Sequence, residues 1–351
     1  MDFSGDYLKF KAEELNRPEG FIEEMESYVS HLREAGLPVI FSPKHWALLM
    51  GTEYEQLSNV LDRRAEFYDE FYFKKKRGGY RQIHAPQPEL HKIQQWIKIF
   101  ILDKLKFPGY VTSYQKKRSI FTNAAFHVKK EIVIKFDLQN FFEDITQEKV
   151  LGIFRMIGYN TAVAVDLARA CCIELAPRNY RNQLFYGDFA CLPQGSPASP
   201  GLSNLAGVKL DLRLSEYAKS KDFAYSRYAD DLTFSGEVKN KIRRSVIQAI
   251  ISEEGFTLNT EKTKYIHRSC RQIVTGITVN EKMALSKKYR RKIHTELHNA
   301  VKFGPYNQLK RNGIHRSNYR EWLLGHILFI RQLHPREAER MKKKFELINW
   351  L

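Results

Sequence analysis

Apolar residues follow two different periods along this chain of 351 residues, one typical of helices and one typical of strands. After Pro88 they recur every three or four positions as far as Leu105, which predicts an amphipathic helix. From Ile132 onward the side chains alternate between two faces, which predicts a strand that ends at Asp137. The helical period also predicts helices over residues 21–35, 147–157, 161–175, 238–252 and 287–301.

Three further segments have strand patterns. Residues 73–86 predict a basic ribbon around the turn at Gly78-Gly79, residues 223–235 predict a β-hairpin, and residues 271–279 predict another strand. Helices and antiparallel strands therefore alternate, and the chain has no Gly-rich dinucleotide fingerprint. This order favours an α+β fold over a doubly wound α/β fold.

Composition narrows the class of protein. With 43% hydrophobic and 28% charged residues the chain can form a sizeable core, which excludes intrinsic disorder and a disulfide scaffold. No apolar run approaches the roughly 20 residues that a membrane span needs, and the first ten residues lack the pattern of a secretory signal. We therefore expect a cytoplasmic protein with no membrane partner. The four cysteines lack zinc-site spacing and are expected to be free, buried thiols.

Charge is unevenly distributed within the net +17. Residues 1–70 hold 7 basic and 15 acidic side chains, a net −8, whereas residues 281–351 hold 17 basic and 6 acidic ones, a net +11. Aromatic residues are interleaved with the basic ones in the C-terminal segment, and together they predict a nucleic-acid partner. The acidic N-terminal segment could brace a neighbouring lobe or dock a protein, and the sequence leaves both open.

Carboxylates mark the candidate chemistry. Asp137 ends one predicted strand, and Asp230-Asp231 lies near the bend of the predicted hairpin. Two carboxylates about 4 Å apart repel by on the order of 4 kcal/mol at an effective dielectric of about 20, and divalent cations reverse this cost. Oxygen ligands alone favour Mg²⁺, and two such ions can drive phosphoryl transfer. An isolated Asp-Asp pair is more often a turn or a helix cap, so its context decides.

Three ordered motifs supply that context. FDLQNFF at 136–142, LPQGSPASP at 192–200 and YADD at 228–231 resemble the catalytic motifs of reverse transcriptases with a right-hand polymerase fold. The resemblance implies that Asp137, Asp230 and Asp231 bind two Mg²⁺ ions. It also implies an α+β fold with fingers, a palm of antiparallel sheet plus helices, and a small helical thumb. The expected parts are N-terminal helices and fingers (1–130), palm with the first catalytic motif (131–150), a helical insertion of fingers or palm (151–190), palm (191–285) and a basic helical thumb (286–351).

Other residues match positions at which this family contacts its dNTP substrates. Phe142 is expected to clash with a ribose 2′-OH and so to select deoxynucleotides, while its neighbour Phe141 is expected in the core. Lys262, in GFTLNTEKTKY, is expected to protonate the leaving pyrophosphate, with Lys264 as a competitor for this role. The nucleotide contacts implied by the resemblance are Lys74, Arg81, Leu138, Phe142, Gln194 and Gly195, with Lys75 and Lys76 as competitors of Lys74.

Two more motifs narrow the resemblance. The NAxxH pattern at 123–127 and the VTG pattern at 274–276, in a compact chain, resemble bacterial retron reverse transcriptases. This implies binding of a cognate structured RNA, priming from the 2′-OH of a guanosine, branched multicopy single-stranded DNA as the product, and anti-phage defence with a separately encoded effector. The expected RNA-binding residues are Asn123, His127, Val274, Thr275, Gly276, Lys287, Lys288, Arg290, Arg291 and Lys292.

Alternatives remain open for these residues and for the function. Asn123 and His127 are equally suited to a structural hydrogen bond, and residues 274–276 to a plain strand with a glycine bulge. A group II intron-like or diversity-generating reverse transcriptase is the nearest rival, although an intron protein is expected to carry a further region after the thumb. A non-catalytic RNA-binding scaffold or antitoxin is the rival from another class, and it would not need three aspartates.

Overall fold

The computed structural model describes residue 10 and residues 14–15, 17–74, 78–175, 179–180, 183–184, 189–311, 313 and 316–350. The chain divides into two compact units, each built from three segments that are distant in sequence. Unit 1 comprises Met1–Gln115, Asp137–Leu214 and Arg243–Asn259, and unit 2 comprises Lys116–Phe136, Ser215–Ile242 and Thr260–Leu351.

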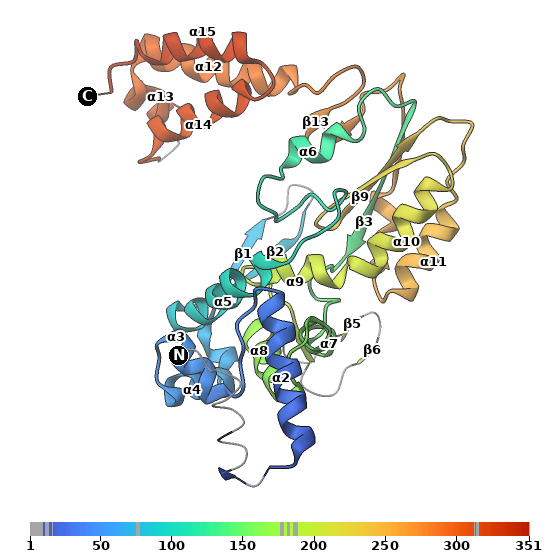
Figure 1. Ribbon diagram of the computed structural model, residues 1–351. Helices are drawn as coiled ribbons and strands as arrows, with labels where there is room; N and C mark the ends of the chain where they lie inside the picture. Colours follow the sequence, from blue (N-terminus) through green and yellow to red (C-terminus); the bar gives the residue numbers. More distant parts are fainter. Residues whose placement is uncertain are drawn as a thin grey trace. The chain divides into compact units, whose positions relative to one another are not determined.

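Unit 1 is mainly helical (Figure 1). Side-chain caps set several helix starts: Thr146 caps α7 (Gln147–Ile157) by accepting from the backbone N–H of Lys149, and Asn160 caps α8 (Thr161–Cys171) by accepting from the backbone N–H of Val163. Its elements are α2 (Glu19–Glu34), α3 (Pro43–Met50), α4 (Tyr54–Asp62), η1 (Arg64–Phe67), β1 (Tyr68–Lys74), β2 (Tyr80–Pro86), α5 (Pro88–Phe100), η2 (Leu102–Lys104), α7 (Gln147–Ile157), α8 (Thr161–Cys171), β4 (Ile173–Leu175), β5 (Asn179–Tyr180), β6 (Gln183–Leu184), β7 (Phe189–Cys191), α9 (Ser199–Ala206), most of α10 (Val208–Lys219), α11 (Arg244–Glu253) and β10 (Thr257–Leu258).

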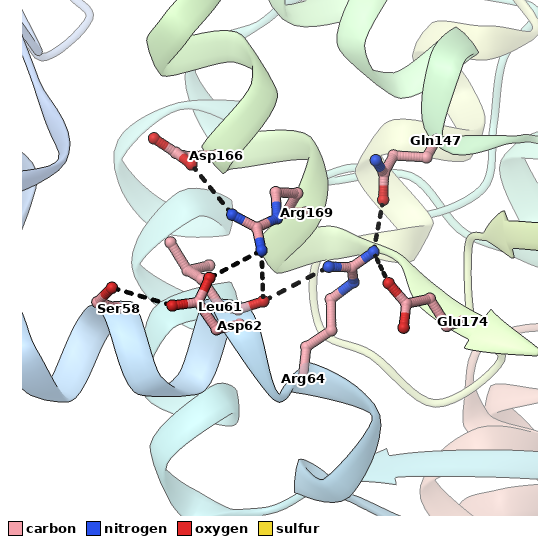
Figure 2. A network of polar contacts seen from close by, with 8 residues as sticks. All are labelled: Ser58, Leu61, Asp62, Arg64, Gln147, Asp166, Arg169 and Glu174. Atoms are coloured by element: carbon pink, nitrogen blue, oxygen red, sulfur yellow. Dashed lines mark hydrogen bonds and ion pairs between the residues drawn. The ribbon is translucent and has the colours of Figure 1, made fainter. Parts of the chain in front are cut away.

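Two arginines tie the helices of unit 1 together, as Figure 2 shows. Arg64 is only 6% exposed; it donates to the Gln147 side chain at 3.0 Å and forms an ion pair with Glu174. Arg169 donates to the carboxylate of Asp62 at 2.9 Å. These contacts join η1 to α7 and β4, and α8 to α4, so the buried guanidinium of Arg64 has charged and polar partners.

Unit 2 contains most of a small antiparallel sheet. Its elements are α6 (Ile120–Ala125), the start of β3 (Ile132–Gln139), β8 (Ala224–Tyr228), β9 (Asp231–Gly236), η3 (Thr260–Lys262), β11 (Lys264–His267), β12 (Ile273–Val274), β13 (Ile277–Thr278), α12 (Lys287–Phe303), α13 (Pro305–Arg311), α14 (Tyr319–Arg331) and α15 (Pro335–Phe345). The strand order is β10-β3-β9-β8, with β11 also paired with β3. Phe136 of β3 packs edge-on against Phe234 of β9, with ring centroids 5.8 Å apart, and so anchors one face of the sheet.

The four C-terminal helices α12 to α15 bury one apolar cluster in unit 2. Leu297, Leu323 and Met341 are fully buried in it, and α6 packs against the same cluster. Phe121 of α6 contacts Phe329 of α14 at a centroid distance of 5.4 Å. None of the helices in the described ranges combines the length and the apolar character that crossing a lipid bilayer requires.

The α+β fold class is confirmed, and the helix predicted over 147–157 has the observed bounds. The helix predicted over 161–175 was too long: Cys172 takes an extended conformation, and residues 173–175 pair with β7 instead. The helix predicted from 238 begins only at Arg244. The single strand predicted over 271–279 is a hairpin, because Thr275 and Gly276 both take positive φ (+44° and +85°) and reverse the chain.

Candidate active site

The YADD segment forms the tight end of the β8–β9 hairpin. Tyr228 pairs with Asp231, which leaves Ala229 and Asp230 as a two-residue loop. Ala229 has φ +56°, a strained conformation for a residue other than glycine. The fully buried Arg227 donates to the carbonyl of Ala229 at 3.4 Å. The loop therefore holds Asp230 at the turn and Asp231 at the first position of β9.

Lys135 of β3 contacts this hairpin within unit 2. Its ammonium lies 4.0 Å from Oδ2 of Asp231. Strand alternation puts Asp137, two residues later, on the same face of β3 as Lys135. Asp137 is 8% exposed, and its carbonyl accepts from the backbone N–H of Asn259 at 2.8 Å. The sequence did not identify Lys135 as a site residue, because a single lysine on a strand belongs to no recognisable motif.

Asp137 belongs to unit 1, and Asp230 and Asp231 belong to unit 2. Within the part of the chain that the structure describes, no three His, Cys, Asp or Glu side chains form a ready-made metal cluster. The convergence of the three aspartates on metal ions therefore stays a prediction. The three side chains suit Mg²⁺, because a set of donors made only of carboxylate oxygens binds a hard divalent cation.

The segment after Asp137 holds the predicted nucleotide contacts of the first motif. Phe142 is half-buried and lies edge-on against Phe141 at 5.7 Å, and Phe141 is 3% exposed and packs on Phe256. Leu138 is 2% exposed, so its side chain belongs to the core and only its backbone is left for a nucleotide contact. The amide of Gln194 donates to the carboxylate of Glu143 at 3.2 Å. Glu143 thus fixes the orientation of Gln194, a role that no motif indicated.

The LPQG loop lies directly against strand β2. The N–H of His84 donates to the carbonyl of Gln194 at 2.7 Å. Gly195 has φ +127°, and a Cβ at this position would lie 2.6 Å from the carbonyl oxygen of His84 and 2.9 Å from the Ile83 side chain. Glycine is therefore required here for close backbone approach.

The two residues predicted to bind the triphosphate, Arg81 and Lys74, lie on different faces of the β1–β2 ribbon. Arg81 pairs with Phe73, whereas Lys74 pairs with Tyr80, so the two cations start from opposite faces of the ribbon. Arg81 shares its face with Ile83, the residue beside Gly195. Arg81 is thus placed on the side of the LPQG loop, and Lys74 is not. Lys75 and Lys76 lie outside the described residues.

Lys262, the predicted proton donor, is the last residue of η3 and is exposed. Its competitor Lys264 pairs with Lys135 on the sheet. The choice between the two lysines stays a prediction.

The NAxxH and VTG motifs do not present most of their side chains to solvent. Asn123, His127 and Val274 are fully buried. Thr275 and Gly276 form the turn of the β12–β13 hairpin, and the Thr275 hydroxyl donates to the carbonyl of Ile120 at 3.0 Å. Asn123 and His127 both make hydrogen bonds to buried serines, which is the structural alternative that the sequence left open, and Gly276 marks a turn rather than a bulge.

The first helix of the basic C-terminal region divides its cations into two groups. Arg290 is half-buried and forms an ion pair with Glu337, which also accepts from His294 at 3.0 Å. Burial raises the pKa of Glu337, but the hydrogen bonds from Arg290 and His294 outweigh it and leave the pKa below its ordinary value. The exposed cations of this helix include Lys287, Lys288, Arg291 and Lys292.

All four cysteines are free thiols, as predicted. Cys171, Cys172 and Cys191 are buried, and burial raises the pKa of the Cys172 thiol well above its ordinary value, which makes it unreactive. Cys270 differs from the prediction because it is exposed.

Comparison with known proteins defines the class. Residues 73–304 match the family described as "Reverse transcriptase (RNA-dependent DNA polymerase)". This match includes the end of β1 from Phe73, all of β2, the three aspartates and the whole of α12. The chain therefore contains the domain of a polymerase that copies RNA into DNA, a class that generally depends on divalent metal ions.

Individual relatives narrow the class to one family. Retron Mx65 reverse transcriptase from Myxococcus xanthus is 32% identical over 325 residues, which cover 90% of this chain and 74% of that protein. Retron Ec86 reverse transcriptase from Escherichia coli is 33% identical, over 76% of this chain and 80% of that protein. The chain belongs to the retron reverse transcriptases. A telomerase structure from Candida albicans aligns with 82% of this chain and 59% of that chain, at 11% identity and a TM-score of 0.43.

Proposed function

We propose that this enzyme primes DNA synthesis from the 2′-OH of a guanosine in its cognate structured RNA. The product is a multicopy single-stranded DNA joined to that RNA through a 2′,5′ bond. A folded RNA can hold one hydroxyl near the reacting phosphate and so replaces a mobile primer by a positioned one. The relatives named as retron enzymes, at 32% and 33% identity over most of the chain, support this choice over an intron-like or diversity-generating lineage.

The proposed catalytic centre is formed by Asp137, Asp230 and Asp231 as ligands of two Mg²⁺ ions. The observation that carries it is the contact of Lys135 with Asp231, because Lys135 shares its face of β3 with Asp137. Bound Mg²⁺ would activate the attacking hydroxyl and stabilise the leaving pyrophosphate. With the metal supplied, Arg81 binds the triphosphate, Gln194 held by Glu143 orients the nucleotide, Phe142 excludes the ribose 2′-OH, and Lys262 donates a proton to pyrophosphate.

The exposed cations of α12 are proposed to hold the RNA. Lys287, Lys288, Arg291 and Lys292 are exposed, and phosphate contacts from such residues recognise the path of a backbone rather than its sequence. The RNA–DNA product and a separately encoded effector are proposed to act together with this enzyme in anti-phage defence.

Sequencing the nucleic acid that co-purifies with the full-length protein tests the priming reaction. We expect a small RNA joined to DNA at a guanosine through a branch that resists ribonucleases specific for 3′,5′ bonds. Recovery of long intron RNA, or of unbranched DNA alone, would contradict the retron reaction.

The catalytic centre is tested by Asp230→Asn. This variant is expected to lose DNA synthesis on a supplied RNA template with a DNA primer, while its affinity for RNA stays within about twofold because binding does not need the metal ligands. Full synthesis by Asp230→Asn would remove the metal-site assignment. Loss of both synthesis and RNA binding would instead favour a structural role for Asp230.

A further inference from the structure

A fully buried polar chain runs from α6 to both strands of the YADD hairpin. His127 Nε2 lies 2.7 Å from the Ser226 hydroxyl on β8, and His127 Nδ1 lies 2.7 Å from the Ser235 hydroxyl on β9. Ser226 in turn donates to Oδ1 of Asn123 at 2.7 Å. All four side chains are fully buried. One imidazole therefore bridges the two strands that carry Asp230 and Asp231 at their end.

The hydrogen-bond donors of this chain can be assigned from its chemistry. Ser226 gives its only proton to Asn123, so it must accept from His127, and Nε2 therefore carries the imidazole proton. A neutral imidazole then accepts at Nδ1, so the hydroxyl of Ser235 donates to it. Burial, and more weakly Lys130 and Lys135, lower the pKa of His127 to about 3, which agrees with a neutral ring. Every link has one direction, so the chain specifies one geometry.

The bridge lies on the functional face of the hairpin. Ser226 pairs with Thr233 and Ala224 pairs with Ser235, so alternation puts both serines on the same face as Asp231. A slip of one residue would turn Asp231 to the other face and would break both contacts with His127.

The VTG turn anchors α6 from the other side. The Thr275 hydroxyl donates to the carbonyl of Ile120, the first residue of α6, and α6 contacts β8, β12 and β13. Thr275 has φ +44°, which is uncommon for a β-branched residue. The hydrogen bond to Ile120 gives a reason for threonine at this strained position. The two motifs thus meet on one short helix.

We propose that Asn123 and His127 are positioning residues that fix the register of the β8–β9 hairpin, and hence Asp230 and Asp231, and that Thr275 secures α6, which carries Asn123 and ends two residues before His127. This inference rests on the proposed catalytic role of the two aspartates. It gives the NAxxH motif a task in catalysis without an RNA contact.

The test uses the full-length protein on a supplied RNA template with a DNA primer. His127→Phe keeps an aromatic ring at this position but removes both hydrogen bonds. We expect kcat to fall by about 10- to 100-fold, because the carboxylates of Asp230 and Asp231 are then misplaced. The KM for dNTP and the Kd for RNA should stay within about twofold, and the Mg²⁺ concentration for half-maximal rate should rise. His127→Gln keeps a donor near Nε2 and is expected to recover part of kcat.

Gln272→Met is the matched control. Gln272 is also fully buried in unit 2, but its amide donates to the carbonyls of Lys130, Glu131 and Ile266. This control is expected to lose thermal stability with kcat unchanged. Ser235→Ala removes only the bond to Nδ1, and it decides the question if His127→Phe does not fold.

Two results would overturn the inference. In the first, His127→Phe and Ser235→Ala keep the kcat and the Mg²⁺ dependence of the control, which would leave the polar chain a packing role only. In the second, RNA affinity falls while kcat holds, which would make His127 part of an RNA site. Asp230→Asn, measured in parallel, separates these results from a failure of the proposed function, because it removes a proposed metal ligand directly and leaves His127 in place.

Discussion

The backbone N–H of His84 donates to the carbonyl of Gln194 across 2.7 Å, and this one bond joins the β1–β2 ribbon to the LPQG loop. The ribbon carries Arg81, and the loop carries the amide that Glu143 orients. Arg81 and Gln194, two candidate nucleotide contacts, lie over a hundred residues apart in sequence. Their relative position is fixed by the close approach of Gly195 to the backbone of β2.

Gly195→Ala tests this contact. The added Cβ would lie 2.6 Å from the His84 carbonyl, and φ is +127°, so we expect unfolding stability to fall by roughly 2 kcal/mol or more. The KM for dNTP should rise because the loop must move away from β2. Gly152→Ala in α7 is the control: its Cβ meets no atom within 4 Å, and alanine favours the helix. If both variants have the same free energy of unfolding in urea and the same KM for dNTP, the close approach of Gly195 to β2 is refuted.

Phe142→Ala tests sugar selection. Phe142 is half-buried, whereas Phe141 lies in the core. Removing the ring of Phe142 should therefore open space at the sugar and raise ribonucleotide incorporation. Phe141→Ala should instead cost about 3 to 5 kcal/mol of stability and leave discrimination as it is. Incorporation of rNTP against dNTP, measured as a ratio of kcat/KM, distinguishes them. An unchanged ratio in Phe142→Ala would place the gate elsewhere.

The sequence predicted elements with a strong local period and missed those set by distant partners. Residues 147–157 have an amphipathic period and a threonine cap, and the helix has the predicted ends. Residues 173–175 continue the apolar pattern of α8, yet they pair with Cys191 and its neighbours, which no local pattern shows.

The same limit applied to the site. The motifs identified Asp230, Gln194 and Gly195 as candidates, because these segments are contiguous. The partners of these segments are single residues remote in sequence, such as Lys135 for Asp231 and Glu143 for Gln194. A buried polar partner has no periodicity of its own, so only the folded chain reveals it.

The buried imidazole of His127 should make folding depend on pH. Its pKa is about 3 in the folded chain, against an ordinary value of 6.5, so the unfolded chain binds more protons between these values. Stability is therefore fully present above pH 6.5 and falls as pH drops towards 3, by up to about 1.4 kcal/mol per pH unit from this group.

Urea unfolding at pH 7.5 and pH 5 measures this dependence. His127→Phe should lose less stability than the parent between the two pH values, by about 2 kcal/mol. The pKa values of His45, His326 and His334 are also lowered, mainly by burial, and these groups contribute alike in both proteins. Identical pH dependence in parent and variant would mean that His127 opens to solvent and charges at low pH.

Salt titration of RNA binding tests the division of cations on α12. Replacing Lys287, Lys288, Arg291 and Lys292 by Gln removes four exposed charges, so the slope of log K against log salt should become shallower by about 3 to 4 if each contacts a phosphate. Arg290→Gln should leave that slope nearly unchanged and lower thermal stability instead, because Arg290 is half-buried and forms an ion pair with Glu337. If Arg290→Gln flattens the slope as much as one of the exposed cations does, its ion pair with Glu337 must open when RNA binds.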